Sequence, residues 1–247
     1  MDPWPDPGAV TVKGDVRALL FDVQGTATDF RSTVIESAER IVGDRSVDWG
    51  PFVDRWRAAY FAALTGLAAR GPEAAWTSVH SVYRSALDEL LAEHGLGSLG
   101  EPEREELTQS WQRLRPWPDT VPGLTRLRSR YTLATLSNAD VGAVIGIAKA
   151  GGLPWDAVFA AEMFGTFKPE PAVYLGAARY LGFEPAQIMM VACHKYDIDA
   201  AAELGFRTAF VARPLEFGPG AKVDVAYEDR YDVNASDFLD LADRMGC

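Results

Sequence analysis

The sequence predicts an α/β fold: a three-layer, doubly wound parallel sheet with a helical cap inserted into it. Three short apolar segments, residues 16–21, 131–136 and 188–192, each end at polar residues. Helical patterns fill the intervals, and apolar strands that alternate with helices are typical of a parallel sheet covered on both faces. The stretch from about 30 to 115 has no strand pattern and interrupts the alternation directly after the first strand.

Polar side chains follow each predicted strand. The first strand runs into Asp22 and a glycine turn at Gly25, the second ends at Ser137 and Asn138, and the third ends near His194. Ligands of such sheets bind at the carboxyl ends of the strands. We therefore expect these polar side chains to converge at one edge of the sheet.

Two helices are predicted in the second half of the core. One spans about 170–182, with Pro171 suited to its first turn, and the other spans about 197–204 and is ended by Gly205. Lys168 is then expected between a strand and the first of these helices.

The predicted cap, residues 30–115, contains four of the seven tryptophans. Apolar side chains recur there at helical spacing in two segments. One segment carries Val53, Trp56, Tyr60, Leu64 and Leu67, and the other carries Trp76, Val79, Tyr83, Leu87 and Leu90. Residues 12–29 and 116–247, which hold the predicted strands, are then expected to form the core.

The composition is that of a globular protein with an excess of acidic groups. Of 247 residues, 48% are hydrophobic, and 35 acidic against 24 basic residues give a formal net charge of −11. Nucleic-acid phosphates and anionic lipids repel such a chain unless basic side chains form a concentrated stripe, which this sequence lacks. We expect neither a nucleic acid nor a membrane surface as a partner.

The sequence predicts a cytoplasmic location. Its two cysteines, Cys193 and Cys247, are too few for a disulfide framework, and Cys193 is expected to fill a small buried space. The segment Met1–Gly8 is acidic and proline-rich, whereas a signal peptide is basic and then apolar. No segment approaches the ~18 apolar residues of a membrane span.

Asp22 and Arg57 are the first candidates for chemistry. Asp22, at the tip of a buried strand before a Gly-Thr turn, is placed as a nucleophile, although an aspartate can equally cap such a turn. Arg57 shares a helical face with Tyr60, Phe61 and Leu64. Its guanidinium either extends to the edge of that face or meets an anion in a pocket, and we favour the pocket.

Four segments together resemble the motifs of the haloacid dehalogenase superfamily, in order and at plausible spacing. They are residues 21–29, 136–138, 167–169 and 191–197. Residues 115–118 and 152–156 look most like its L-2-haloacid dehalogenase (type II) branch. The resemblance covers the chain after its first dozen residues and implies a Rossmann-like core with an inserted cap.

The resemblance implies a covalent mechanism. Asp22 would attack the halogen-bearing carbon and form an ester, Arg57 would receive the departing halide, and water would open the ester. Three side chains would hold and polarise Asp22, and two would bind the substrate carboxylate. The first set is Thr26, Lys168 and Asp197, and the second is Ser137 and Asn138.

Several of these residues also have a simpler interpretation. Ser137 and Asn138 could cap a helix. Thr26 could bond its own turn, and Lys168 could be a solvated loop lysine. His194 could position or deprotonate the hydrolytic water, or only bond a backbone carbonyl, and the sequence leaves that choice open.

Gln24 bears on the leaving group. Phosphatases of the superfamily have an aspartate two residues after the nucleophile, where it protonates the departing alkoxide. An amide cannot act as a general acid, so the leaving group here should need no proton, and halide is such a group. Related dehalogenases have an aromatic residue at this position, so a more polar substrate pocket is expected here.

The sequence predicts metal-independent and cofactor-independent hydrolysis of small 2-haloalkanoic acids to 2-hydroxy acids. A hard dication needs several oxygen ligands, and the last motif offers only Asp197. The expected binding partners are a small anionic substrate and halide, and the resemblance allows a homodimer. Two alternatives stay open: a superfamily phosphatase, and a biosynthetic or binding protein on this fold with a non-halogenated substrate.

Overall fold

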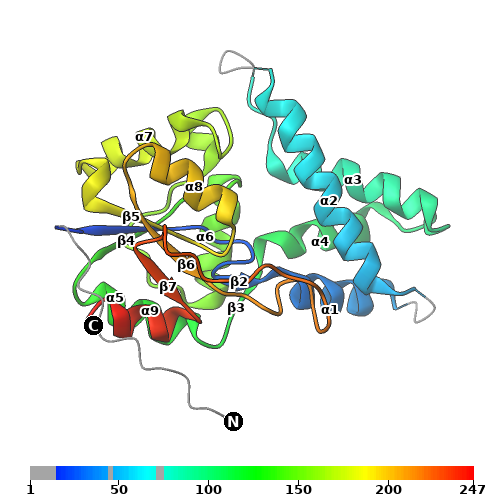
Figure 1. The fold of residues 1–247 in the computed structure, drawn as a ribbon. Coiled ribbons are helices and arrows are strands. Elements are labelled where there is room, and N and C mark those ends of the chain that lie inside the picture. The colour runs from blue at the N-terminus through cyan, green and yellow to red at the C-terminus, as the bar shows by residue number, and fades with distance from the viewer. Residues whose placement is uncertain (1–14, 44–46, 71–74) are drawn as a thin grey trace, which may run out of the picture.

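The computed structural model describes residues 15–43, 47–70 and 75–247. A five-stranded parallel sheet lies at its centre, in the order β4, β1, β5, β6, β7 (Figure 1). The strands are β1 (Ala18–Phe21), β4 (Thr132–Thr135), β5 (Ile188–Ala192), β6 (Arg207–Val211) and β7 (Val233–Ala235). The predicted α/β fold class is confirmed.

Helices cover both faces of the sheet. On one face lie α7 (Pro171–Leu181) and α8 (Lys195–Glu203), and on the other lie α5 (Thr120–Arg128), α6 (Val141–Gly151) and α9 (Phe238–Arg244). Successive residues of a strand point to opposite faces. Leu20 therefore packs in the cluster with α7 and α8, whereas Leu19 and Phe21 pack in the cluster with α5 and α9. Burial of both faces explains why these strands are almost wholly apolar.

A helical unit lies beside the carboxyl ends of the strands (Figure 1). It consists of α1 (Phe30–Val42), α2 (Trp49–Ala68), α3 (Val79–Glu93), α4 (Glu101–Gln109) and the 3-10 turn η1 (Ser110–Gln112). The chain enters it after β2 (Thr28–Asp29) and leaves it at β3 (Arg115–Pro116), and these two short strands pair antiparallel. The predicted cap, residues 30–115, begins directly after β2 and ends at the first residue of β3. The division into domains stays a prediction, and its start at residue 12 lies outside the described residues.

Most of the apolar side chains that were predicted at helical spacing in the cap are buried on one helix each. On α2, Val53, Trp56, Tyr60 and Leu64 are buried. On α3, the buried side chains include Val79, Tyr83, Leu87 and Leu90. Trp76 was placed on the same helix wrongly: the Ser78 side chain caps the helix by accepting a hydrogen bond from the Ser81 amide, so α3 begins only at Val79.

Two further differences concern the core. The segment before Lys168 is not a strand, because residues 157–160 form only two isolated bridges, one to β4 and one to Ser137 beyond its end, and then enter the 3-10 turn η2 (Ala161–Phe164). The last two strands, β6 and β7, were not predicted. They extend the sheet beyond β5 and, as described below, position a buried glutamate beside the site.

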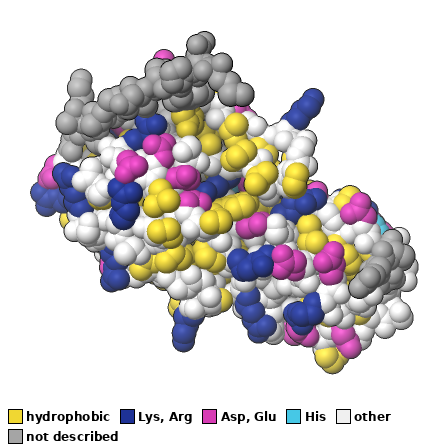
Figure 2. Space-filling view, turned by 90° about the horizontal axis from the view of Figure 1, so that it is seen from below, with side chains coloured by type: hydrophobic (Ala, Val, Ile, Leu, Met, Phe, Trp, Pro, Cys, Tyr) yellow, Lys and Arg dark blue, Asp and Glu magenta, His cyan; other side chains and the backbone are white. Residues whose placement is uncertain are grey.

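Charges of both signs are interspersed on the face of the molecule shown in Figure 2. The expectation that nucleic acid is not a partner stays a prediction. Among the described residues, none of the helices combines the length and the apolar character needed to cross a membrane. The predicted features of Met1–Gly8 lie outside the described residues.

Candidate active site

The carboxyl ends of β1, β4 and β5 meet the helical unit at a small cavity. Its lining is formed by Asp22, Gln24, Arg57, Tyr60, Phe61, Ser137, Asn138, Lys168, His194 and Tyr196. Seven of the nine site residues predicted from the sequence are in this set. The other two, Thr26 and Asp197, lie behind the wall and hydrogen-bond to residues that line it.

The Asp22 carboxylate is only 6% exposed and is held by three donors. Its Oδ2 accepts a hydrogen bond from Thr26 Oγ1 at 2.7 Å and lies 3.2 Å from His194 Nδ1, while Oδ1 accepts one from Lys168 Nζ at 3.0 Å. Burial alone would raise the pKa of Asp22. The Lys168 charge, His194 and the Thr26 hydroxyl overcome that effect and hold the pKa well below its ordinary value. Asp22 is therefore ionised at neutral pH.

Lys168 is a buried ammonium between two carboxylates. Its side chain is 1% exposed, and Nζ donates to both Asp22 and Asp197. Tyr174 fixes Asp197 from the other side, because its hydroxyl donates to Oδ1 at 2.6 Å. Burial would lower the pKa of Lys168, but the two carboxylates raise it above its ordinary value. The interpretation as a solvated loop lysine is excluded.

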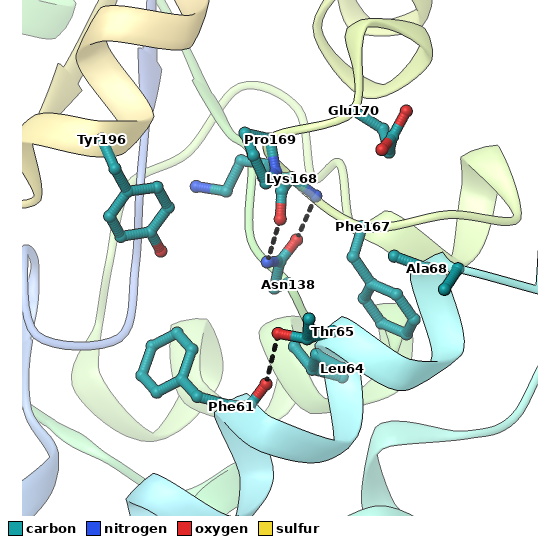
Figure 3. Close-up of a pocket in the computed structure, with 11 residues that line it drawn as sticks. Phe61, Leu64, Thr65, Ala68, Asn138, Phe167, Lys168, Pro169, Glu170 and Tyr196 are labelled. Carbon is teal, nitrogen blue, oxygen red and sulfur yellow. Dashed lines mark hydrogen bonds between the residues drawn. The ribbon is translucent and has the colours of Figure 1, made fainter.

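Asn138 fixes the backbone of Lys168. Its Oδ1 accepts a hydrogen bond from the Lys168 amide at 2.7 Å, and its Nδ2 donates to the Lys168 carbonyl at 3.0 Å (Figure 3). The side chain predicted to bind the substrate is thus already engaged. This pairing replaces the strand that was expected to position Lys168.

Ser137 and Asn138 do not cap α6, because that helix begins at Val141 and its N-cap residue is Asp140. Both residues nevertheless line the cavity. Within the described part of the chain, no hydrogen bond involves the Ser137 hydroxyl or the backbone N–H of Asn138. These two donors, rather than the Asn138 amide, are available for a ligand carboxylate.

Arg57 is buried in an aromatic box. Its guanidinium carbon lies 4.6 to 5.8 Å from the ring centroids of Phe30, Tyr60, Phe61 and Trp111. The residue is 4% exposed, and none of the carboxylates in the described ranges forms an ion pair with it. A desolvated charge without an opposite charge is costly. The site is therefore suited to an anion, and the interpretation in which Arg57 extends to solvent is wrong.

Gln24 and Tyr83 orient Arg57. Arg57 Nη1 donates to Gln24 Oε1 and, at 2.7 Å, to the Tyr83 hydroxyl, which donates in turn to Gln24 Oε1 at 3.1 Å. Because two donors meet that oxygen, the Gln24 amide nitrogen is the atom left for the cavity. Tyr83 was predicted only as a core residue. Burial raises its pKa to about 12, so it binds here as a neutral phenol.

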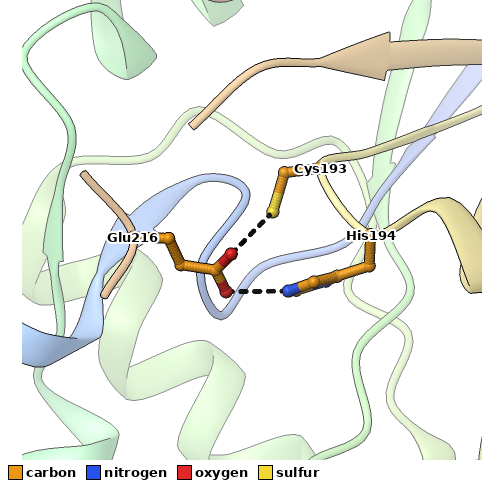
Figure 4. A group of neighbouring side chains, drawn as sticks. All are labelled: Cys193, His194 and Glu216. Atoms are coloured by element: carbon orange, nitrogen blue, oxygen red, sulfur yellow. Dashed lines mark hydrogen bonds and ion pairs between the residues drawn. The ribbon is translucent and has the colours of Figure 1, made fainter. Parts of the chain in front are cut away.

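Glu216 is a site residue that the sequence did not reveal. Its Oε1 lies 2.8 Å from His194 Nε2 (Figure 4). Since His194 Nδ1 faces Asp22, the imidazole bridges Asp22 and Glu216. Burial would lower the pKa of His194, but Cys193, Glu216 and Asp22, in that order, raise it well above the ordinary 6.5. His194 is thus an imidazolium in this state. Both ring nitrogens face carboxylates, so the interpretation as a carbonyl-bonded histidine is wrong.

Cys193, His194 and Glu216 also form a cluster whose ligand atoms lie within 4.8 Å of one another. The set fits a metal ion poorly. Burial raises the pKa of the Cys193 thiol, so it stays protonated and is a weak ligand. The His194 nitrogen that faces the cluster is already paired with Glu216, and Cys193 Sγ lies 3.8 Å from the other oxygen of that carboxylate.

The loop after Asp22 is fixed from outside the cavity. Arg213 Nε donates to the Thr26 carbonyl at 2.7 Å, and both terminal nitrogens of Arg213 bind Asp119 at 2.8 Å. Gly25 has a φ of 93°, and a Cβ atom there would lie 2.4 Å from Glu216 Oε1. Glycine is therefore needed at this position for its conformation and for the close approach of Glu216.

Comparison with known proteins places the site in context. The model of the haloacid dehalogenase-like hydrolases matches residues 16–205. An (S)-2-haloacid dehalogenase of Xanthobacter autotrophicus is 30% identical over 204 residues, which are 80% of this chain and 76% of that protein.

Solved structures agree with this match. The crystal structure of an L-2-haloacid dehalogenase is 43% identical, with a TM-score of 0.87 and coverage of 93% of this chain and 99% of that one. A structure of the Xanthobacter autotrophicus enzyme with chloropropionic acid covalently bound is 26% identical, with a TM-score of 0.78 and coverage of 94% and 98%.

Proposed function

Because the chain belongs to the haloacid dehalogenase-like hydrolase family, we propose that it hydrolyses small 2-haloalkanoic acids to 2-hydroxy acids through an ester on Asp22, without a metal ion. One observation carries this proposal. Arg57, a buried cation with no carboxylate partner among the described residues, lines the same small cavity as the ionised Asp22. An anionic nucleophile and a receptor for an anionic leaving group thus face one small space.

In the first step, Asp22 attacks the halogen-bearing carbon. Oδ1 is the attacking atom, because it accepts one hydrogen bond whereas Oδ2 has two donors. A carbon–oxygen bond forms, the carbon–halogen bond breaks, and the halide leaves toward Arg57 and the Gln24 amide nitrogen. Attack from the side opposite the halogen inverts that carbon. The Ser137 hydroxyl and the Asn138 N–H hold the substrate carboxylate.

In the second step, water opens the ester. Once Asp22 is esterified it is uncharged, so the pKa of His194 falls and the imidazolium releases a proton to solvent. The freed Nδ1 takes a proton from the water that attacks the Asp22 carboxyl carbon, and passes it to the departing alkoxide of the 2-hydroxy acid. The new Asp22 carboxyl group then reprotonates His194. One water is consumed, and one halide and one proton are released.

Gln24 argues against a phosphatase. Its amide cannot protonate an alkoxide, and its oxygen is already bound to Arg57 and Tyr83. The Lys168 ammonium also occupies the space between Asp22 and Asp197, where a dication would need both carboxylates.

The proposal is tested by halide release from haloacetates and from the two enantiomers of 2-chloropropionate in EDTA. We expect turnover that the chelator leaves unchanged. In a single turnover in ¹⁸O-labelled water, the label should enter the Asp22 carboxylate and not the first 2-hydroxy acid formed, because the product oxygen comes from Asp22. Direct attack of water on the substrate would put the label in the product, and absence of halide release from every haloacid would reject the proposal.

Glu216→Gln is expected to lower kcat by roughly tenfold or more, the scale of a weakened general base. The substitution removes the charge that supports His194 but keeps an acceptor for its Nε2–H. The pKa of His194 should fall, so the acidic limb of kcat against pH should move to lower pH while KM changes little. Glu228→Gln, on a partly exposed residue that pairs with Lys195, is the matched control. If the acidic limb of kcat against pH does not shift in this variant, Glu216 has a structural role only.

The same variant has a pH-dependent effect on stability. The pKa of His194 is raised in the folded protein, so its charged form contributes stability that is full below the unfolded-state pKa of about 6.5 and is lost as the pH rises through the folded-state pKa. Denaturant unfolding should therefore show the largest deficit of Glu216→Gln near about pH 6 and a smaller one at alkaline pH. A deficit that grows with pH would contradict this assignment of charge.

A further inference from the structure

We propose that a second cavity beside the catalytic one, here called the chain pocket, binds the carbon chain at C2 of the substrate. The preferred substrates would then be 2-halo acids with an unbranched apolar chain of several carbons rather than haloacetates. This inference rests on the proposed function and specifies its substrate class.

The chain pocket has a volume of about 410 Å³ and lies between the helical unit and the core (Figure 3). Helix α2 supplies Phe61, Leu64 and Ala68 to its wall, and the loop before α7 supplies Phe167 and Pro169. Leu64 and Phe167 are each 4% exposed. The pocket is therefore a largely apolar cleft that is partly open to solvent.

The two cavities are adjacent. Phe61, Asn138, Lys168 and Tyr196 line both of them. The cavity at Asp22 is far smaller than the chain pocket, with a volume of about 10 Å³ against about 410 Å³. The reacting groups of the substrate already contact the lining of the smaller cavity, so the larger adjoining space for a chain at C2 is the chain pocket.

The charges around the chain pocket favour an uncharged chain. Among the described residues of its wall Lys168 is the one cation, and that ammonium is already bound to Asp22 and Asp197. Glu170 lies on the wall with an exposed side chain, and it would repel a second carboxylate. The structure thus selects against halogenated dicarboxylic acids and for monoacids with an alkyl chain.

The test is a series of bromo acids: bromoacetate and the (S) forms of 2-bromopropionate, 2-bromobutyrate and 2-bromohexanoate, with bromosuccinate added. Burial of one methylene contributes roughly fourfold to kcat/KM. We expect kcat/KM to rise by about that factor per carbon from propionate to hexanoate, and to be at least tenfold lower for bromosuccinate than for bromobutyrate. A constant or falling kcat/KM along the series would overturn the inference. No bromide release from any acid would instead reject the proposed function.

Matched variants of α2 locate the effect. Ala68→Phe fills the chain pocket and should lower the ratio of kcat/KM for bromohexanoate to that for bromopropionate at least tenfold. Ala62→Phe makes the same change at an exposed position of the same helix and should keep the wild-type ratio. Equal ratios in the two variants would show that the chain binds elsewhere. Because the readout is a ratio within one variant, partial loss of folded protein does not affect it.

Discussion

Asp22→Asn is expected to lower halide release by roughly 10⁴-fold or more, the scale on which enzymes lose activity when their nucleophile is removed. The amide keeps the size of the side chain but is uncharged and a poor nucleophile, so no ester can form. Turnover is measured as halide released per active site, and binding of a 2-hydroxy acid is measured by calorimetry. Loss of turnover with retained binding identifies a covalent hydrolase.

The outcome also separates the alternatives. A binding protein on this fold would show no halide release in the wild type, and binding would survive the substitution. Asp199→Asn is the matched control, since it removes a partly exposed carboxylate from the same neighbourhood of α8. Substantial residual turnover in Asp22→Asn would remove Asp22 from the role of nucleophile.

Lys168→Met is expected to lower the free energy of unfolding by about 3 to 5 kcal/mol at neutral pH, because it leaves Asp22 and Asp197 buried without their shared counter-charge. The effect depends on pH. In the wild type the pKa of Asp22 is lowered, so its stabilising pairing is present above the unfolded value of 3.8 and is lost as the pH falls through the folded value. The wild type therefore keeps this stabilisation from pH 7 down to about pH 4, whereas in the variant the pKa of the uncompensated buried Asp22 is raised and the carboxylate gains its proton within that range. Because protonation removes the cost of the buried charge, the deficit of the variant should shrink as the pH falls from 7 to about 4.

Denaturant unfolding at several pH values measures this deficit. Lys195→Met is the control, because that lysine pairs with Asp224 and Glu228 near the surface and should contribute at most about 1 kcal/mol. Halide release by the variant should also fall, since the pKa of Asp22 rises when Lys168 is removed. Equal destabilisation by the two substitutions would contradict the central role of Lys168.

The strand ends that converge at the site could be predicted from the sequence, because each is marked by a short apolar run followed by polar residues. Asp22 and His194 lie one and two residues after apolar strands that pair in one parallel sheet. Arg57 could be placed from helical spacing, since its neighbours on α2 are aromatic. For these residues, the position at a strand end or on a helix face was enough to indicate that the side chain reaches the site.

Glu216 could not be found in this way. It comes 22 residues after its partner His194, in the segment after β6, and a single glutamate near a glycine-rich loop has no distinctive local signal. The role of Asn138 was similarly hidden, because its bonds to the Lys168 backbone span 30 residues. Gly25 is an indirect sign of Glu216, because a glycine close to the nucleophile leaves space that another side chain can occupy.

The ribbon of β2 and β3 has a consequence for how such enzymes diverge. Both crossings between the sheet and the helical unit pass through two paired strands, so the ends of the insertion lie side by side. An insertion with adjacent ends can lengthen, shorten or be exchanged during evolution without altering the register of the sheet. The nucleophile and its counter-charge come from the sheet side of that junction, whereas Arg57 comes from the inserted side. Replacement of the helical unit alone could therefore change which leaving group is accepted, while Asp22 and Lys168 stay in place.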